Sequence, residues 1–177
     1  MLSCYSNHVI YIDDENQLKL HYACKLNNNR LNNEIRAWLT KPQKEDSQKH
    51  EMVAHIRRGD YISAGLPTLS LKNVFRHLKQ CSFSSRSLTI VTDSPDLIQV
   101  EFQRLDKTCN VICGDELSDL RLMTLSKIFI ASDSQFSLVS ILLSTSMETV
   151  FIPSRWKNFK IVENLEDRQN IKQVIIT

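Results

Sequence analysis

Short apolar segments alternate with helical patterns from residue 52 onward, and this alternation limits the fold more than any other feature of the sequence. Strands separated by helices of about ten residues are typical of βαβ units, which build parallel sheets. The segments are apolar at successive positions, as expected for strands that are covered on both faces. The sequence therefore predicts an α/β fold with a Rossmann-like, mostly parallel sheet and flanking helices.

The expected strands and helices follow one another regularly. The apolar runs predict strands at residues 52–56, 88–91, 110–113, 128–131 and 149–152, and a β-branched run ends the chain at 174–176. Apolar residues at helical spacing predict a helix after each of the first four strands. These helices are marked by Leu71, Val74, Phe75 and Leu78; by Ile98, Phe102 and Leu105; by Leu117, Leu120 and Leu125; and by Phe136, Leu138, Ile141 and Leu142.

The first fifty residues differ from the rest. They are polar and rich in asparagine, and a helix is expected only around residues 31–39. Residues 41–51 are charged, contain Pro42 and lack the apolar spacing of a helix or strand, so they indicate an exposed linker. The prediction is an N-terminal region and linker at 1–50, followed by a Rossmann-like domain at 51–177.

The chain has only three glycines, Gly59, Gly65 and Gly114. Both G-x-G-x-x-G and the P-loop need closely spaced glycines, so neither phosphate-binding loop is present. If the protein binds a nucleotide, side chains must hold its phosphates.

The net charge and the lack of targeting signals in the sequence argue against several other classes of protein, namely nucleic-acid-binding, membrane-spanning and secreted proteins. A net charge of +2 is not the basic excess of a nucleic-acid-binding protein, so no nucleic-acid partner is expected. No stretch approaches the about 20 apolar residues of a membrane span, and no signal peptide is found. A cytoplasmic location is expected, with a peripheral position at the inner face of a membrane as the alternative. No histidine or carboxylate spacing indicates a metal site.

Three polar clusters follow expected strands. Residues 57–61 (RRGDY) follow the first, with His55 inside it; Asp93 and Ser94 follow the second; residues 132–135 (SDSQ) follow the fourth. Ligands of open parallel sheets bind beyond the carboxyl ends of the strands. The three clusters should therefore meet at one edge of the sheet.

Each cluster has a structural and a functional interpretation. Guanidinium groups match phosphate oxygens in geometry. If the strand continues, Arg57 and Arg58 point to opposite faces of the sheet. One arginine would then bind a ligand, and the other would pair with an acid such as Asp60 or Asp93. The structural alternative is an arginine–aspartate pair that fixes the turn. Ser134 could cap the following helix, contact a phosphate or do both, and the local sequence favours the plain cap. Asp93 has the same two alternatives, a helix cap or a contact to a ribose or base.

The segment VAHIRRGDY (53–61) resembles the H-x-R-R-G-D-Y signature of the α-1,2-fucosyltransferases, glycosyltransferase family 11. TIVTDSPDL, SDLRLMTLSKIFIASDSQFSLVSILLS and VFIPSRW resemble later segments of the family in the same order. The resemblance covers roughly residues 52–157. The family's paired tryptophans correspond here to Leu138 and Val139, and its asparagine to Asp133.

The resemblance implies that residues 51–177 are the nucleotide-sugar-binding domain, the donor-binding half of a GT-B-type enzyme. Such an enzyme needs neither a metal nor a cofactor. It transfers fucose from GDP-fucose to a galactoside-like acceptor with inversion. The resemblance assigns Arg57 to the diphosphate and implies that His55, Arg58 and Asp60 shape the loop. The acceptor proton needs a base, and Asp60 is the nearest candidate, although pairing with arginine would make Asp60 a poor base. The implied donor-binding residues are His55, Arg57, Arg58, Asp93, Asp133, Ser134, Gln135 and Phe136.

The family's Gly-rich acceptor-side segment, G-G-x-G-N-Q-x-F, has no counterpart in this sequence. A truncated member is therefore expected, or half of a split enzyme whose partner chain supplies the missing domain. The alternative function is a non-catalytic module that binds GDP-fucose or is purely structural. A phosphate-handling hydrolase is disfavoured because no nucleophile motif is found.

Overall fold

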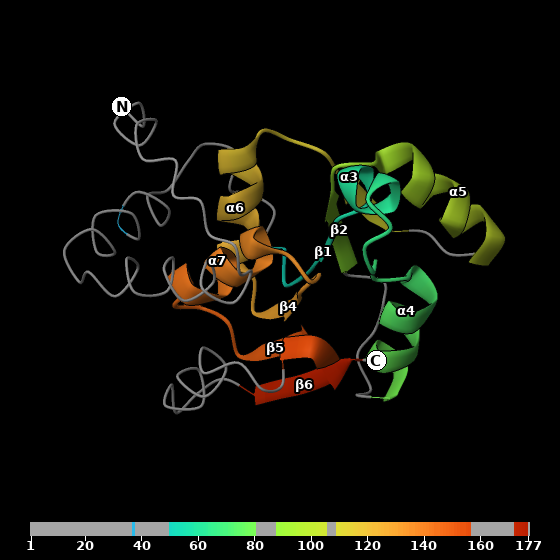
Figure 1. Cartoon of the computed structure of the whole chain (residues 1–177). Helices are drawn as coiled ribbons and strands as arrows, with labels where there is room; N and C mark the ends of the chain where they lie inside the picture. Colours follow the sequence, from blue (N-terminus) through green and yellow to red (C-terminus); the bar gives the residue numbers. More distant parts are fainter. Residues whose placement is uncertain (1–36, 38–49, 81–87, 106–108, 157–171, 177) are drawn as a thin grey trace.

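The protein contains one parallel β-sheet. The structure, a computed structural model, describes residue 37 and residues 50–80, 88–105, 109–156 and 172–176. Within these residues six strands pair in the order β3-β2-β1-β4-β5-β6, and every neighbouring pair is parallel (Figure 1). This is the strand order of the Rossmann fold. The strands are β1 (Met52–Ile56), β2 (Leu88–Thr92), β3 (Asn110–Ile112), β4 (Ile128–Ile130), β5 (Thr149–Pro153) and β6 (Lys172–Ile176).

The α/β fold and its Rossmann-like parallel sheet are thus confirmed, and all five expected strands are present within one residue of the predicted ends. That the sheet is part of a GT-B-type enzyme stays a prediction, and so does the domain boundary at residue 50. The helix expected at 31–39 lies outside the described residues except for Ala37, which is helical.

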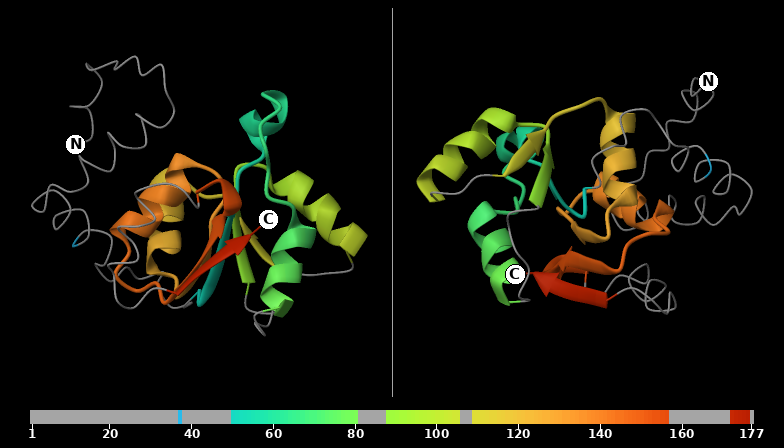
Figure 2. Two further views of the ribbon diagram at one scale, coloured as in Figure 1. Left: turned by 60° about the horizontal axis from the view of Figure 1, so that its bottom comes forward. Right: turned by 180° about the vertical axis from the view of Figure 1, so that it is seen from behind.

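Helices cover both faces of the sheet (Figure 2). Helices α4 and α5 pack on one face, and α6 and α7 pack on the other, so the sheet lies between two helical layers. The short helix α3 projects from the carboxyl edge of the strands (Figure 2, left). The helices are α3 (Gly59–Ser63), α4 (Leu71–Gln80), α5 (Pro95–Leu105), α6 (Glu116–Leu125), α7 (Gln135–Leu143) and the 3₁₀ turn η3 (Ser154–Trp156).

Strand β1 lies at the centre and contributes to both cores. All five of its residues are buried. Met52, Ala54 and Ile56 belong to the core under α4 and α5, whereas Val53 belongs to the core under α6 and α7. Because side chains alternate along a strand, His55 faces the same layer as Val53. This alternation decides which helical layer each side chain after β1 can reach.

Helix α6 is present as predicted, but its buried side differs from the expected leucine stripe. Leu117 is 41% exposed, whereas Asp119 and Met123, one helical turn apart, are buried. The carboxylate of Asp119 accepts a hydrogen bond from the backbone N–H of Gly114 at 3.2 Å. This bond satisfies a polar group on the buried side of the helix, which a search for apolar spacing does not find.

The turn after β1 contains the helix α3, which the sequence does not predict. It ends in a Schellman motif, in which the N–H of Gly65 donates to the carbonyl of Ile62 and the N–H of Leu66 donates to that of Tyr61. Gly65 has a φ of 66°, the left-handed conformation that glycine adopts without strain. The glycine therefore turns the chain back toward α4.

Candidate functional site

The strand order reverses between β1 and β4, and the polar residues after these strands meet at this switch point. The chain leaves β1 toward one side of the sheet and later returns to its other side to form β4. Such a reversal leaves a crevice beyond the carboxyl ends of the two strands, where open α/β proteins bind ligands. The turn after β2 joins the same edge, since Asp93 hydrogen-bonds the turn after β1. The expected convergence of the three clusters is confirmed.

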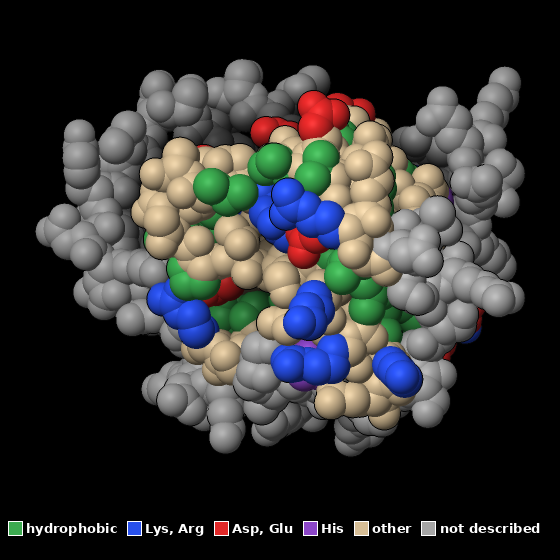
Figure 3. All heavy atoms as spheres, turned by 90° about the vertical axis from the view of Figure 1, so that its right-hand side faces the viewer, with side chains coloured by type: hydrophobic (Ala, Val, Ile, Leu, Met, Phe, Trp, Pro, Cys, Tyr) green, Lys and Arg blue, Asp and Glu red, His purple; other side chains and the backbone are tan. Residues whose placement is uncertain are grey.

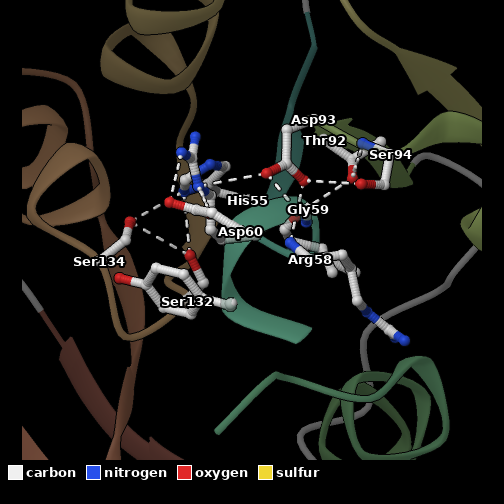
Figure 4. Close-up of polar contacts among 12 residues, drawn as sticks. His55, Arg58, Gly59, Asp60, Thr92, Asp93, Ser94, Ser132 and Ser134 are labelled. Atoms are coloured by element: carbon white, nitrogen blue, oxygen red, sulfur yellow. Dashed lines mark hydrogen bonds and ion pairs between the residues drawn. The ribbon is translucent and has the colours of Figure 1, made fainter. Parts of the chain in front are cut away.

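His55 and three serines form a buried polar cluster between β1 and α7, and Figure 4 shows His55 with two of them, Ser132 and Ser134. The Nδ1 atom of His55 lies 2.7 Å from Ser137 Oγ, 3.0 Å from Ser132 Oγ and 3.3 Å from Ser134 Oγ. All four side chains are buried. The ring of Phe136 meets the His55 ring edge-on, with centroids 5.5 Å apart. The cluster therefore fixes the start of α7 against the end of β1.

Burial lowers the pKa of His55 from 6.5 to about 4, and the positive charge of Arg57 acts in the same direction, while Asp93 opposes it. The imidazole is therefore neutral at pH 7. No carboxylate hydrogen-bonds His55 within the described residues, and Ser137 is fully buried. The cluster thus lacks the oriented base and accessible hydroxyl of a serine hydrolase.

Arg57 faces two carboxylates at the mouth of the switch point. Its Nε donates to Asp60 Oδ1 at 2.9 Å, and its Nη2 donates to Asp60 Oδ2 at 3.1 Å, a bidentate pair. Asp93 Oδ2 lies 3.2 Å from the same Nε. The hydrogen bond with Asp60 raises the pKa of Arg57, and the same bond lowers the pKa of Asp60. Both groups are therefore charged at neutral pH.

Asp93 fixes the turn after β1. Its carboxylate accepts hydrogen bonds from the backbone N–H of Arg58 at 2.9 Å and of Gly59 at 3.1 Å, and from the hydroxyl of Ser94 at 3.2 Å (Figure 4). A Cβ on Gly59 would lie 2.9 Å from Asp93 Oδ2. A side chain at position 59 would therefore force the Asp93 carboxylate to shift.

Arg58 points to the opposite layer from Arg57, as the alternation of β1 predicts. Its Nη2 forms an ion pair with Glu101 of α5 and donates to the carbonyl of Leu69 at 3.2 Å. Glu101 also accepts a hydrogen bond from the backbone N–H of Leu71, the first residue of α4, at 3.0 Å. The Arg58 side chain is only 13% exposed. These contacts hold the Arg58 side chain against α4 and α5.

Asp133 connects the turn after β4 to η3 and α3. Its carboxylate accepts hydrogen bonds from Trp156 Nε1 at 2.6 Å and from Arg155 Nη1 at 3.0 Å. Its backbone carbonyl accepts one from the Tyr61 hydroxyl at 2.9 Å, so α3 reaches across from β1 to the β4 turn. The carboxylate of Asp133 thus has two protein donors.

Ser134, Gln135 and Phe136 form the start of α7. Ser134 caps the helix, with its Oγ accepting from the backbone N–H of Ser137 at 3.2 Å. The first turn of a helix has N–H groups without intrahelical partners and carries a partial positive charge. Gln135 and Phe136 belong to this turn and are half-buried. The cap expected from the sequence is confirmed, and it places the helix N-terminus at the switch point.

Positive and negative side chains are mixed along this edge. On the face that carries α3, α4 and α5, acidic groups lie at the top of the view, and basic groups with an acidic group among them lie below (Figure 3). Arg57 and Arg58 are accompanied by three carboxylates, those of Asp60, Asp93 and Glu101. The turn after β1 is therefore not a strongly positive surface.

The structure brings the three polar clusters to one edge of the sheet, but the partners of the individual residues differ. His55, Arg57 and Ser134 lie around the switch point, Arg58 lies against α5, and Asp93 is part of the turn itself. Sequence reasoning missed Glu101 and Ser137 as the partners of Arg58 and His55, and Trp156 as the partner of Asp133. Glu101 carries a sequence signal, because it lies on α5 between the buried Ile98 and Phe102.

The described residues contain no group of three or more histidine, cysteine, aspartate or glutamate side chains that could hold a metal ion. Among the same residues, no helix is both long and apolar enough to span a membrane.

In comparisons with known proteins, no family model matches the chain, and neither a curated protein nor a solved structure matches it.

Proposed function

We propose that the protein binds the diphosphate of a nucleotide sugar at the switch point between β1 and β4 and transfers the sugar to a hydroxyl group. The resemblance noted above specifies GDP-fucose as the donor and a galactoside-like glycan as the acceptor. The observation that carries the proposal is the position of Arg57 at the carboxyl end of β1, two residues after His55, whose ring contacts Ser134 at the cap of α7. The proposal includes the cytoplasmic location, or a peripheral position at the inner face of a membrane, that the sequence predicts.

The chemistry of the transfer explains why these groups would matter. The bond between the sugar C1 and the phosphate oxygen breaks, the electron pair goes to the diphosphate, and the acceptor oxygen forms the new bond to C1. Negative charge therefore develops on the leaving diphosphate. The guanidinium of Arg57 and the N–H groups at the start of α7 are donors that would stabilise this charge. A preorganised donor of this kind contributes about 3–4 kcal/mol to transition-state stabilisation.

The acceptor hydroxyl must also lose its proton to a base. Asp60 lies beside Arg57 and is the candidate from the sequence. The hydrogen bond from Arg57 lowers the pKa of Asp60, which weakens it as a base. This observation favours the second candidate function, a module that binds the nucleotide sugar without transferring it.

Titration calorimetry with GDP and GDP-fucose tests binding, and release of GDP in the presence of a galactoside acceptor tests transfer. We expect Arg57→Ala to weaken GDP binding by about tenfold or more, since a charged hydrogen-bond pair is lost. Arg76→Ala is the matched control, because Arg76 is an exposed arginine on α4. It should bind GDP like the wild type.

The outcomes separate the candidates. Binding with GDP release supports the transferase, and binding without release supports the non-catalytic module. Absence of binding by the wild-type protein contradicts both. If Arg57→Ala binds within about twofold of the wild type, the assignment of Arg57 to the diphosphate is wrong.

A further inference from the structure

We infer that Asp60 is an internal competitor for the anion at Arg57 and sets the affinity of the site for phosphate-bearing ligands. The inference rests on the proposed function, because it assumes that the diphosphate binds Arg57. It adds a specificity-determining residue to that site, in a role distinct from the base considered above.

The geometry of the pair is that of a bound oxyanion. Both Asp60 oxygens accept from Arg57, one from Nε at 2.9 Å and one from Nη2 at 3.1 Å. Two parallel N–H···O bonds to one planar edge are the arrangement by which arginine binds a phosphate. The carboxylate thus lies where a ligand phosphate would meet the same edge of the guanidinium. A phosphate can use that edge only after Asp60 has left it.

Asp60 can leave, whereas Asp93 is held in place. The Asp60 side chain is 62% exposed, on the first turn of the short helix α3, so a side-chain rotation moves its carboxylate into water. The Asp93 side chain is 24% exposed, and its oxygens accept from the backbone N–H groups of Arg58 and Gly59. The exchange therefore takes place at Asp60, with the turn after β1 unchanged.

This arrangement selects ligands by charge. A diphosphate carries more negative charge than the carboxylate and can replace it, while a neutral or weakly charged sugar gains too little from Arg57 to do so. Exposed ion pairs are weak, so the exchange remains possible for a strong anion. Removing the charge of Asp60 should therefore strengthen the binding of every ligand that uses Arg57 through phosphate.

The experiment compares wild type, Asp60→Asn and Asp96→Asn by titration calorimetry with GDP and with inorganic pyrophosphate. Asparagine keeps the size of the side chain and removes its charge. Asp96 is an exposed aspartate on the first turn of α5, so its variant controls for loss of one negative charge without loss of the Arg57 pair. We expect Asp60→Asn to bind both ligands about threefold more tightly, and Asp96→Asn to bind them like the wild type.

Each result has a consequence. Equal or weaker binding by Asp60→Asn, with clear binding by the wild type, overturns the inference and leaves the proposed function standing. An equal gain in Asp96→Asn also overturns it, because the effect then comes from net charge. If neither the wild type nor Asp60→Asn binds GDP or pyrophosphate, the proposed function itself is wrong. A melting temperature close to that of the wild type establishes that each variant is folded.

Discussion

At the scale of single residues, the site consists of charged and polar groups that already have partners in the protein. The carboxylate of Asp93 accepts from two backbone N–H groups, and the carboxylate of Asp133 accepts from Trp156 and Arg155. The sequence shows which residue types are near the strand ends, but the partner of each depends on distances in the fold. It therefore predicted the candidates more completely than their roles.

Stability should depend on pH through His55. Its pKa of about 4 in the folded protein is below the 6.5 of the unfolded chain, so the unfolded state binds a proton first as the pH falls. The stabilisation from the neutral ring is complete above pH 6.5 and is lost progressively between pH 6.5 and about 4. Because a pKa difference of one corresponds to 1.36 kcal/mol, the free energy of unfolding falls by about 3 kcal/mol over this range.

Urea unfolding of the wild type and of His55→Gln at several pH values between 7.5 and 4.5 measures this dependence. The other titrating groups are the same in both proteins, so the difference between the two curves isolates His55. We expect the free energy of unfolding to fall less steeply in the variant. Parallel curves would show that the ring is not buried in its neutral form.

At the scale of elements, the strands and most helices were predictable because their apolar patterns are local. Strand β1 coincides with the predicted residues 52–56, and α7 begins after its predicted cap at Ser134. Helix α3 was not predictable in this way, since its five residues have no buried member and hence no apolar periodicity. The contact between α5 and the turn after β1 depends on how the helix is rotated on the sheet, which no local pattern records.

Glu101 connects three elements, so its loss should destabilise the protein. It pairs with Arg58 in the turn after β1 and accepts from the N–H of Leu71 at the start of α4. In Glu101→Ala a largely buried guanidinium loses its counter-charge, and we expect the free energy of unfolding to fall by about 2–3 kcal/mol. Chemical denaturation measures the change. Gln103 is an exposed residue on the same helix, and Gln103→Ala should change the free energy of unfolding by less than about 0.5 kcal/mol. A loss in Gln103→Ala as large as that in Glu101→Ala would contradict the role assigned to Glu101.

At the scale of the whole molecule, two apolar cores on opposite faces of one sheet hold the fold together. Phe129 of β4 is fully buried in the core under α6 and α7, and Phe151 of β5 is fully buried in the core under α4 and α5. The sequence predicted this two-sided burial from strands that are apolar at successive positions. It could not indicate which layer each helix covers, because that depends on the handedness and order of the connections.

Phe129 should therefore be among the residues on which global stability depends. Phe129→Ala leaves a cavity beneath α6 and α7, and such substitutions cost about 3–5 kcal/mol. That is a large part of the about 5–15 kcal/mol by which domains are stable. Calorimetric melting gives the loss, with Leu117→Ala as an exposed apolar control. Equal melting temperatures of Phe129→Ala and the wild type would exclude a tightly packed core at this position.

The central place of β1 also has a consequence for the order in which the chain gains its structure. β1 pairs on one side with β2, Met52 opposite Leu88, and on the other with β4, Met52 opposite Ile128. The second pairing closes a chain segment about twice as long, and each doubling adds about 0.6 kcal/mol of entropic penalty. We expect the amide of Val91, which faces β1, to gain protection in pulse-labelled hydrogen exchange before that of Ile130. The reverse order would refute this. The switch point would then be the last part of the sheet to assemble, and a ligand bound there would report that both halves are in place.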